Sequence, residues 1–101
     1  MTQLENISAI LKSIAPELVE KYNVSSLGLF GSVVRSDFSI LHSDIDILVD
    51  FSKPVGIEFI DLANFLEAKI NRKVDLVSKK GVKPGYLTQI ENDLIYVYKA
   101  A

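Results

Sequence analysis

The chain has 101 residues, of which 49% are hydrophobic and 24% charged, and 13 acidic against 11 basic residues leave a formal charge of −2. This length predicts a single domain over residues 1–101. With no cysteine and one histidine, the sequence excludes disulfides, thiolate nucleophiles and zinc sites built on Cys or several His. The acidic balance argues against direct nucleic-acid binding. Without a membrane-length apolar stretch or a signal-peptide pattern, we expect a soluble cytoplasmic protein with no membrane association.

Hydrophobic periodicity predicts alternating helices and strands. Thr2-Gln3-Leu4-Glu5 has the form of a capping box, and Pro16 interrupts the helix that follows, so a break is expected near Ile14–Ala15. In the N-terminal half of the chain, the pattern predicts a helix that begins at Thr2 and a second helix over Pro16–Tyr22. It then predicts a strand over Ser26–Phe30, helical turns over Gly31–Arg35, a loop over Ser36–Ser43 and a strand over Ile45–Phe51. The second half predicts a turn over Ser52–Gly56, a helix over Ile57–Ile70, a strand over Val74–Val77, a helix over Pro84–Glu91 and a short edge strand over Ile95–Tyr98.

This alternation predicts an α/β or α+β fold, with a small mixed sheet flanked by helices. Helical spacing places Phe59, Ile60, Ala63, Leu66 and Ile70 on one stripe, and Ile57 is also expected in the core. The later tyrosines are expected as core or edge residues, with a partner interface as the alternative: Tyr86, Tyr96 and Tyr98.

Three aspartates interrupt apolar strand segments, and this placement is the main anomaly of the sequence. Asp44 and Asp46 are two residues apart, so strand geometry directs both carboxylates to one face. If the strand that carries Asp75 is a neighbour, three carboxylates converge and need a cation to offset their repulsion. Oxygen ligands favour a hard ion such as Mg²⁺ over zinc. Taken singly, Asp44 could be a turn or cap residue, and Asp75 an exposed strand residue.

Gly31 and Ser32 follow a predicted strand at the start of helical turns. Such a position leaves backbone N–H groups and a hydroxyl available to an anion. Glycine allows close approach of a phosphate, and Arg35, one turn later, can pair with it. A Gly-Ser pair alone is equally typical of a plain turn, so its weight depends on the aspartates that follow.

Other polar residues have ordinary structural interpretations. His42 is expected as a solvated loop residue, with contact to a phosphate or the acceptor as the alternative. Asp37 is expected as a turn residue and Asp50 as a strand-end residue, although Asp50 shares strand parity with Asp44 and Asp46, so a place at the border of the site is its alternative. Lys79 and Lys80 follow the Asp75 strand and are expected at the surface.

The motif Gly31-Ser32, eleven further residues, then Asp44-Ile45-Asp46, with Asp75 in a later strand, resembles the nucleotidyltransferase superfamily with a DNA-polymerase-β-like catalytic core. Within it, Leu29–Asp37 and Ser43–Phe51 are similar to the minimal nucleotidyltransferases (MNT proteins), which are often antitoxins paired with HEPN-domain toxins. The resemblance covers nearly the whole chain. It departs at Val33, where the family often has arginine, and at Ser36, where it often has glycine.

The resemblance implies a Mg²⁺-dependent nucleotidyltransferase that moves AMP from ATP to a hydroxyl, expected to be a tyrosine, of a partner HEPN toxin. Two Mg²⁺ ions would be the cofactor, because nucleotidyl transfer needs charge neutralisation on both the attacking and the leaving oxygen. The implied nucleotide-binding residues are Gly31, Ser32 and Arg35, and the implied catalytic and metal-ligating residues are Asp44, Asp46 and Asp75. Asp75 would also help to deprotonate the acceptor.

Two other functions stay open at this stage. One is a non-catalytic interaction module that neutralises its partner by binding, although such a protein has no physical need for clustered carboxylates within strands. The other is a nucleotidyltransferase that acts on small molecules, which would need an added acceptor domain or a homodimer that builds one. Base preference and oligomeric state are not determined by the sequence.

Overall fold

The computed structural model of the chain describes residues 2–35 and 43–100. Its elements are α1 (Gln3–Ser13), α2 (Ala15–Tyr22), β1 (Val24–Phe30), a 3₁₀ turn η1 (Gly31–Val33), β2 (Ile45–Phe51), α3 (Glu58–Ile70), β3 (Val74–Ser78), α4 (Pro84–Asp93) and β4 (Ile95–Lys99). Each predicted helix and strand is therefore confirmed within these residues. The predicted loop over 36–42, with Asp37 and His42, lies outside them. None of the described helices is long and apolar enough to cross a membrane.

Local sequence signals set the ends of the first elements. The Thr2 hydroxyl accepts a hydrogen bond from the Glu5 N–H at 3.1 Å, and the Thr2 N–H donates to the Glu5 carboxylate at 3.0 Å, which completes the capping box. Ile14 separates α1 from α2, and Pro16 lies in the first turn of α2, as predicted. Asn23 ends α2 in the left-handed conformation, so the chain enters β1 at once. The strand consequently begins two residues before the predicted start at Ser26.

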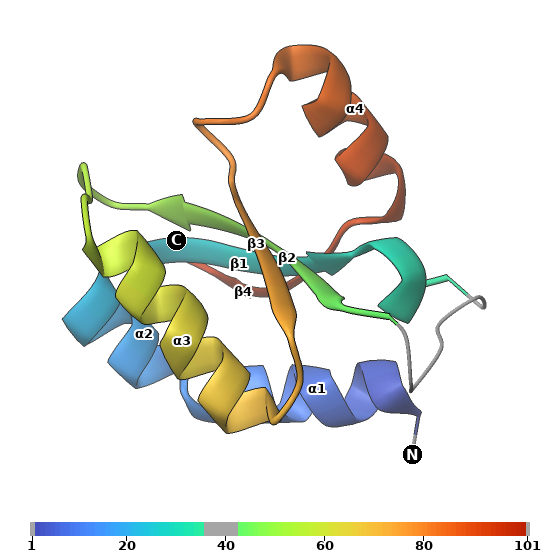
Figure 1. Ribbon diagram of the computed structural model, residues 1–101, viewed down its shortest axis with the longest axis horizontal. Coiled ribbons are helices and arrows are strands. Elements are labelled where there is room, and N and C mark those ends of the chain that lie inside the picture. Colours follow the sequence, from blue (N-terminus) through green and yellow to red (C-terminus); the bar gives the residue numbers. More distant parts are fainter. Residues whose placement is uncertain (1, 36–42, 101) are drawn as a thin grey trace.

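The four strands form one mixed sheet in the order β3-β2-β1-β4. β1 pairs antiparallel with both β2 and β4, whereas β2 and β3 are parallel and joined by α3. As Figure 1 shows, α1, α2 and α3 cover one face of the sheet, and α4 stands alone on the other. The predicted small mixed sheet flanked by helices is thus confirmed, with β4 as an edge strand.

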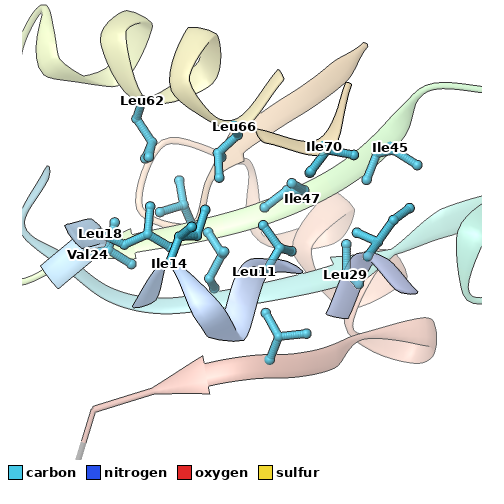
Figure 2. Packing of buried hydrophobic residues seen from close by; sticks show 14 of the residues in the cluster. Leu11, Ile14, Leu18, Val24, Leu29, Ile45, Ile47, Leu62, Leu66 and Ile70 are labelled. Carbon is cyan, nitrogen blue, oxygen red and sulfur yellow. The ribbon is translucent and has the colours of Figure 1, made fainter. Parts of the chain in front are cut away.

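The two faces of the sheet differ in how completely they are covered. In β2, the main core receives Ile45, Ile47, Val49 and Phe51, where they meet buried leucines of α1, α2 and α3 (Figure 2). The alternate residue Leu48 faces α4 instead, in a small cluster with Phe30 and Ile90. Asp46 has the same strand parity as Leu48, so it belongs to the sparsely covered face. This is why a carboxylate within an apolar strand keeps contact with solvent.

The predicted apolar stripe of α3 is partly wrong. Ile57 is 73% exposed and Ile60 is 60% exposed, whereas the buried residues of the helix are Leu62, Leu66 and Ile70. Apolar residues occur on most sides of this helix, so periodicity alone could not identify the face that packs on the sheet. The contact with α1, α2 and β2 selects the Leu62–Ile70 side.

Two substitutions on α3 test this corrected orientation. Leu66→Ala removes a fully buried side chain and is expected to lower the free energy of unfolding by about 2–5 kcal/mol. Ile60→Ala is the matched control and should change it by no more than about 0.5 kcal/mol, because its side chain is already solvated. Urea unfolding followed by circular dichroism measures both. Equal losses in the two variants would contradict the orientation.

Candidate active site

The parallel pairing of β2 with β3 brings two of the predicted carboxylates together. Asp46 and Asp75 occupy paired positions in the register of these strands. On its other side, Asp46 is paired with Phe30, the last residue of β1. A row of Phe30, Asp46 and Asp75 therefore crosses three strands, and the Gly31 turn begins directly beside Asp46.

Gly31 is required where the chain turns past Asp46. Its φ is +74°, in the left-handed region, and a Cβ atom built there would overlap the Asp46 carboxylate. The Gly31 carbonyl accepts hydrogen bonds from Val34 N and Arg35 N, both at 3.1 Å, so the turn closes tightly. The first N–H groups of such a turn, at Ser32 and Val33, are the groups that a helical start offers to an anion. The predicted Gly31-Ser32 phosphate turn is thus next to the carboxylate pair, although it forms one 3₁₀ turn and no longer helix.

The environment of Asp46 disfavours a negative charge. Partial burial is the largest cause that raises its pKa, and the charges of Asp75 and Asp44 and a hydrogen bond with Asp75 add to it. Arg35 opposes this effect, and the net result is a pKa of about 6 against an ordinary value of 3.8. The excess negative charge at this point is what a bound cation would relieve.

Asp44 lies immediately before β2 and is exposed. The segment that carries it is tied to the start of β3, because Arg72 donates to the Ser43 carbonyl at 3.0 Å and Ile45 N donates to the Lys73 carbonyl at 2.9 Å. These bonds help hold β2 and β3 in the register that pairs the two strand aspartates. Arg72 was not singled out by the sequence patterns.

The predicted convergence of three carboxylates is met in part. Over residues 2–35 and 43–100, no three acidic or histidine side chains form a ready metal-binding group. The structure brings Asp46 and Asp75 into contact, and Asp44 acts on Asp46 through its charge.

A pocket of about 200 Å³ lies between this row and α4. Its sheet side contains Phe30, Gly31 and Asp46, and Arg35 of the turn reaches its rim. Its α4 side contains Tyr86, Gln89, Ile90 and Asp93, which recur at the spacing of one helix face. The pocket is thus lined by the predicted phosphate turn, by the Asp46 carboxylate and by α4, a helix that carries none of the motif residues.

Arg35, predicted to pair with phosphate, is instead bound to α4 in this structure. Its guanidinium donates to the Asp93 carboxylate at 2.7 Å across the pocket rim. Both side chains keep solvent contact, so the pair contributes at most about 1 kcal/mol to stability. The pair joins the turn to the C-terminal end of α4.

The pocket residues of α4 are the part of the site that sequence reasoning missed. Tyr86 was expected as a core, edge or interface residue, but it is 48% exposed and lines the pocket. Gln89 and Asp93 belong to none of the sequence motifs. The available signal was their spacing from Tyr86 along one helix face, but nothing in the sequence says that this face meets the end of β1.

Asp50 lies away from the site, at the other end of β2. It is within 3.9 Å of the Lys80 ammonium group and lines a separate pocket with Lys53 and Ser78. The interpretation of Asp50 as a strand-end residue is confirmed. Its parity with Asp46 does not bring it to the row, because four residues of strand span about 13 Å.

Comparison with known proteins identifies the family. The family model for the nucleotidyltransferase domain matches residues 11–97. The chain belongs to the nucleotidyltransferase domain family. Over 98 residues, this nucleotidyltransferase is 41% identical to the protein adenylyltransferase MntA of Thermococcus cleftensis, an alignment that covers 96% of this chain and 98% of the relative. The enzyme class implied by the resemblance is thereby confirmed.

Solved structures agree with this family fold. A protein described as a proposed minimal nucleotidyltransferase superposes on this nucleotidyltransferase with a TM-score of 0.75 and 28% identity, covering 94% of this chain and 95% of the other. A chain from the complex of the tri-AMPylated Shewanella oneidensis HEPN toxin with its MNT antitoxin gives a TM-score of 0.67 at 20% identity, covering 92% and 73%. The first supports the predicted minimal nucleotidyltransferase core, and the second shows a shared fold.

Proposed function

We propose that this chain is a Mg²⁺-dependent protein adenylyltransferase that transfers AMP from ATP to a tyrosine hydroxyl of a HEPN-domain toxin and so acts as its antitoxin. The observation that carries the proposal is the Asp46–Asp75 pair beside the Gly31 turn. The adenylyltransferase relative supports the reaction, and the neighbouring fold found with a HEPN toxin supports the partner.

The donor atoms of the three aspartates suit magnesium. Asp44, Asp46 and Asp75 would hold the metal, and they offer only carboxylate oxygens, the ligands that Mg²⁺ prefers. Partial burial first, and then the neighbouring Asp75 and Asp44 charges, raise the pKa of Asp46, and a bound cation would offset both effects. Bound Mg²⁺ would supply charge neutralisation for the triphosphate during transfer.

The nucleotide would lie in the pocket with its phosphates toward the turn. Gly31 has no side chain, so an anion can approach the backbone of the turn closely. Ser32 contributes its N–H and hydroxyl, and the Arg35 guanidinium lines the same pocket. Triphosphate oxygens would then compete with Asp93 for Arg35.

The acceptor hydroxyl would approach from the side of Asp75, which is exposed. Its oxygen attacks the α-phosphorus, a new O–P bond forms, and the bond to the bridging oxygen breaks to release pyrophosphate. The hydroxyl proton passes to the Asp75 carboxylate, the member of the row that is paired with Asp46. Because this carboxylate is open to solvent, a side chain from a second protein can reach it.

Incubation with α-labelled ATP, Mg²⁺ and the HEPN-domain product of the adjacent gene tests the proposal. We expect label on the toxin, its loss when Mg²⁺ is chelated or when Asp75 is changed to Asn, and retention in the matched control Asp50→Asn. Label on a toxin whose tyrosines are replaced by phenylalanine would contradict the tyrosine acceptor. Absence of label with any of the four nucleoside triphosphates, with neutralisation unchanged, would favour the non-catalytic binding module instead.

A further inference from the structure

We infer that Tyr86 and Gln89 of α4 form the base-recognition wall of the pocket and that they select adenine. The inference rests on the proposed function, because it assumes that the pocket takes a nucleoside triphosphate. It adds a subsite to the motif residues, all of which lie on the sheet and its turn.

The geometry divides the pocket into two chemically different sides. Gly31, Arg35 and Asp46 provide the anion-binding and carboxylate groups on one side. Opposite them, Tyr86 and Gln89 are three residues apart on one helix face, and both side chains are exposed. A nucleotide with its phosphates at the turn can therefore extend its base toward α4.

Close packing holds α4 in place as a preformed wall. Ile90, on the same helix face, is buried against Phe30 and Leu48 of the sheet. The α4–β4 junction touches β1 so closely that a Cβ at Gly28 would lie 2.6 Å from the Leu94 Cδ1 atom. An ordered wall loses little conformational freedom when a ligand binds.

The two side chains suit adenine in particular. A tyrosine ring offers a flat face for stacking on a base. The Gln89 amide presents one donor and one acceptor side by side, which match the acceptor N7 and the donor N6 amino group of adenine. Guanine presents two acceptors on the same edge, for which a glutamine has no matching pair of groups.

Binding measurements on the full chain separate base recognition from phosphate recognition. Isothermal titration with Mg²⁺ and either ATP, GTP or tripolyphosphate should show about tenfold weaker ATP binding in Tyr86→Ala, while tripolyphosphate affinity is unchanged. Tyr86→Phe should retain ATP affinity. Gln89→Ala should reduce the preference for ATP over GTP, again by about tenfold. Glu91→Ala, exposed on the outer face of α4, is the matched control and should behave as the wild type.

The outcomes distinguish this inference from the proposed function. If the wild type binds ATP but Tyr86→Ala binds it equally well, the base wall is wrong and the proposed function is unaffected. If Tyr86→Ala weakens ATP and tripolyphosphate to the same extent, Tyr86 acts on the shape of the pocket and the inference also fails. If the wild type binds neither ATP nor tripolyphosphate, the proposed function is wrong, and the inference that rests on it is wrong as well.

Discussion

Replacing Asp46 by asparagine is expected to lower AMP transfer by at least about 10³-fold. The substitution keeps the shape of the side chain but removes the negative charge at the centre of the Phe30–Asp46–Asp75 row. With Asp46 as a ligand of Mg²⁺, as proposed, loss of its charge would remove several kcal/mol of transition-state stabilisation, and each tenfold in rate corresponds to about 1.4 kcal/mol. Single-turnover labelling of the toxin measures the effect. Asp50→Asn, on the same strand and face, should retain transfer within about threefold.

The same substitution should stabilise the metal-free protein. In the folded chain the Asp46 carboxyl keeps its proton up to a pKa of about 6, whereas in the unfolded chain it releases it near 3.8. Between these values the folded state binds more protons, so the free energy of unfolding falls as pH rises. Asp46→Asn removes this pH-dependent fall in the free energy of unfolding. Because Asp46 remains partly solvated, screening limits the gain above pH 6 to about 1 kcal/mol.

Denaturant titrations in EDTA at pH 3.5, 5 and 7.5 test this stability change. The two proteins should be nearly equal at pH 3.5, and the variant should become the more stable of the two as pH rises. A variant that is less stable than the wild type at pH 7.5 would contradict the conclusion that burial and the neighbouring carboxylates make the Asp46 charge unfavourable in the folded chain.

Replacing Gly31 by alanine is the second change with a large expected effect. The φ of +74° costs an L-residue about 1–2 kcal/mol, and the new Cβ overlaps the Asp46 carboxylate. The carboxylate must therefore leave its present position in the row. A displacement of about 1 Å at a reacting centre lowers the rate by about 10²-fold, so we expect a loss of transfer of this size or more. The free energy of unfolding should also fall by about 1–3 kcal/mol.

Gly85→Ala is the matched control for Gly31→Ala. A Cβ at Gly85 meets nothing within 4 Å, and the residue lies in the first turn of α4. Alanine is the better helix former, so this variant should be as stable as the wild type or up to about 1 kcal/mol more stable, with full transfer. If both variants lose transfer equally, the close approach of Gly31 to Asp46 is not what limits the reaction.

Much of the fold, and the carboxylate part of the candidate site, follow from local features of the sequence. The capping box at Thr2, the proline in α2 and the β-branched run of β2 are short-range signals, and the elements that they predict are present. The anomaly of Asp46 and Asp75 within apolar strands is also local. Their meeting depended on β2 and β3 being neighbours, as the register of the parallel pair then confirmed.

Features that depend on long-range packing were harder to predict. Apolar residues lie on most sides of α3, so only its contact with the sheet shows that Ile57 and Ile60 face solvent. Arg35 is predicted to bind phosphate because its nearest motif neighbours are Gly31 and Ser32, and nothing in the sequence pattern indicates its ion pair with Asp93, 58 residues away. No periodicity connects such a pair.

By itself, the sequence determined the order of the elements, the oxygen-only chemistry of the site and the Gly31-Ser32 turn beside it, because helix caps, strand parity and ligand type are local properties. Only the tertiary structure decided that α4 crosses to the uncovered face of the sheet and turns Tyr86, Gln89 and Asp93 toward Asp46. Its small core with Phe30 and Leu48 joins residues more than 40 positions apart, and such contacts are chosen by the packing of the whole chain.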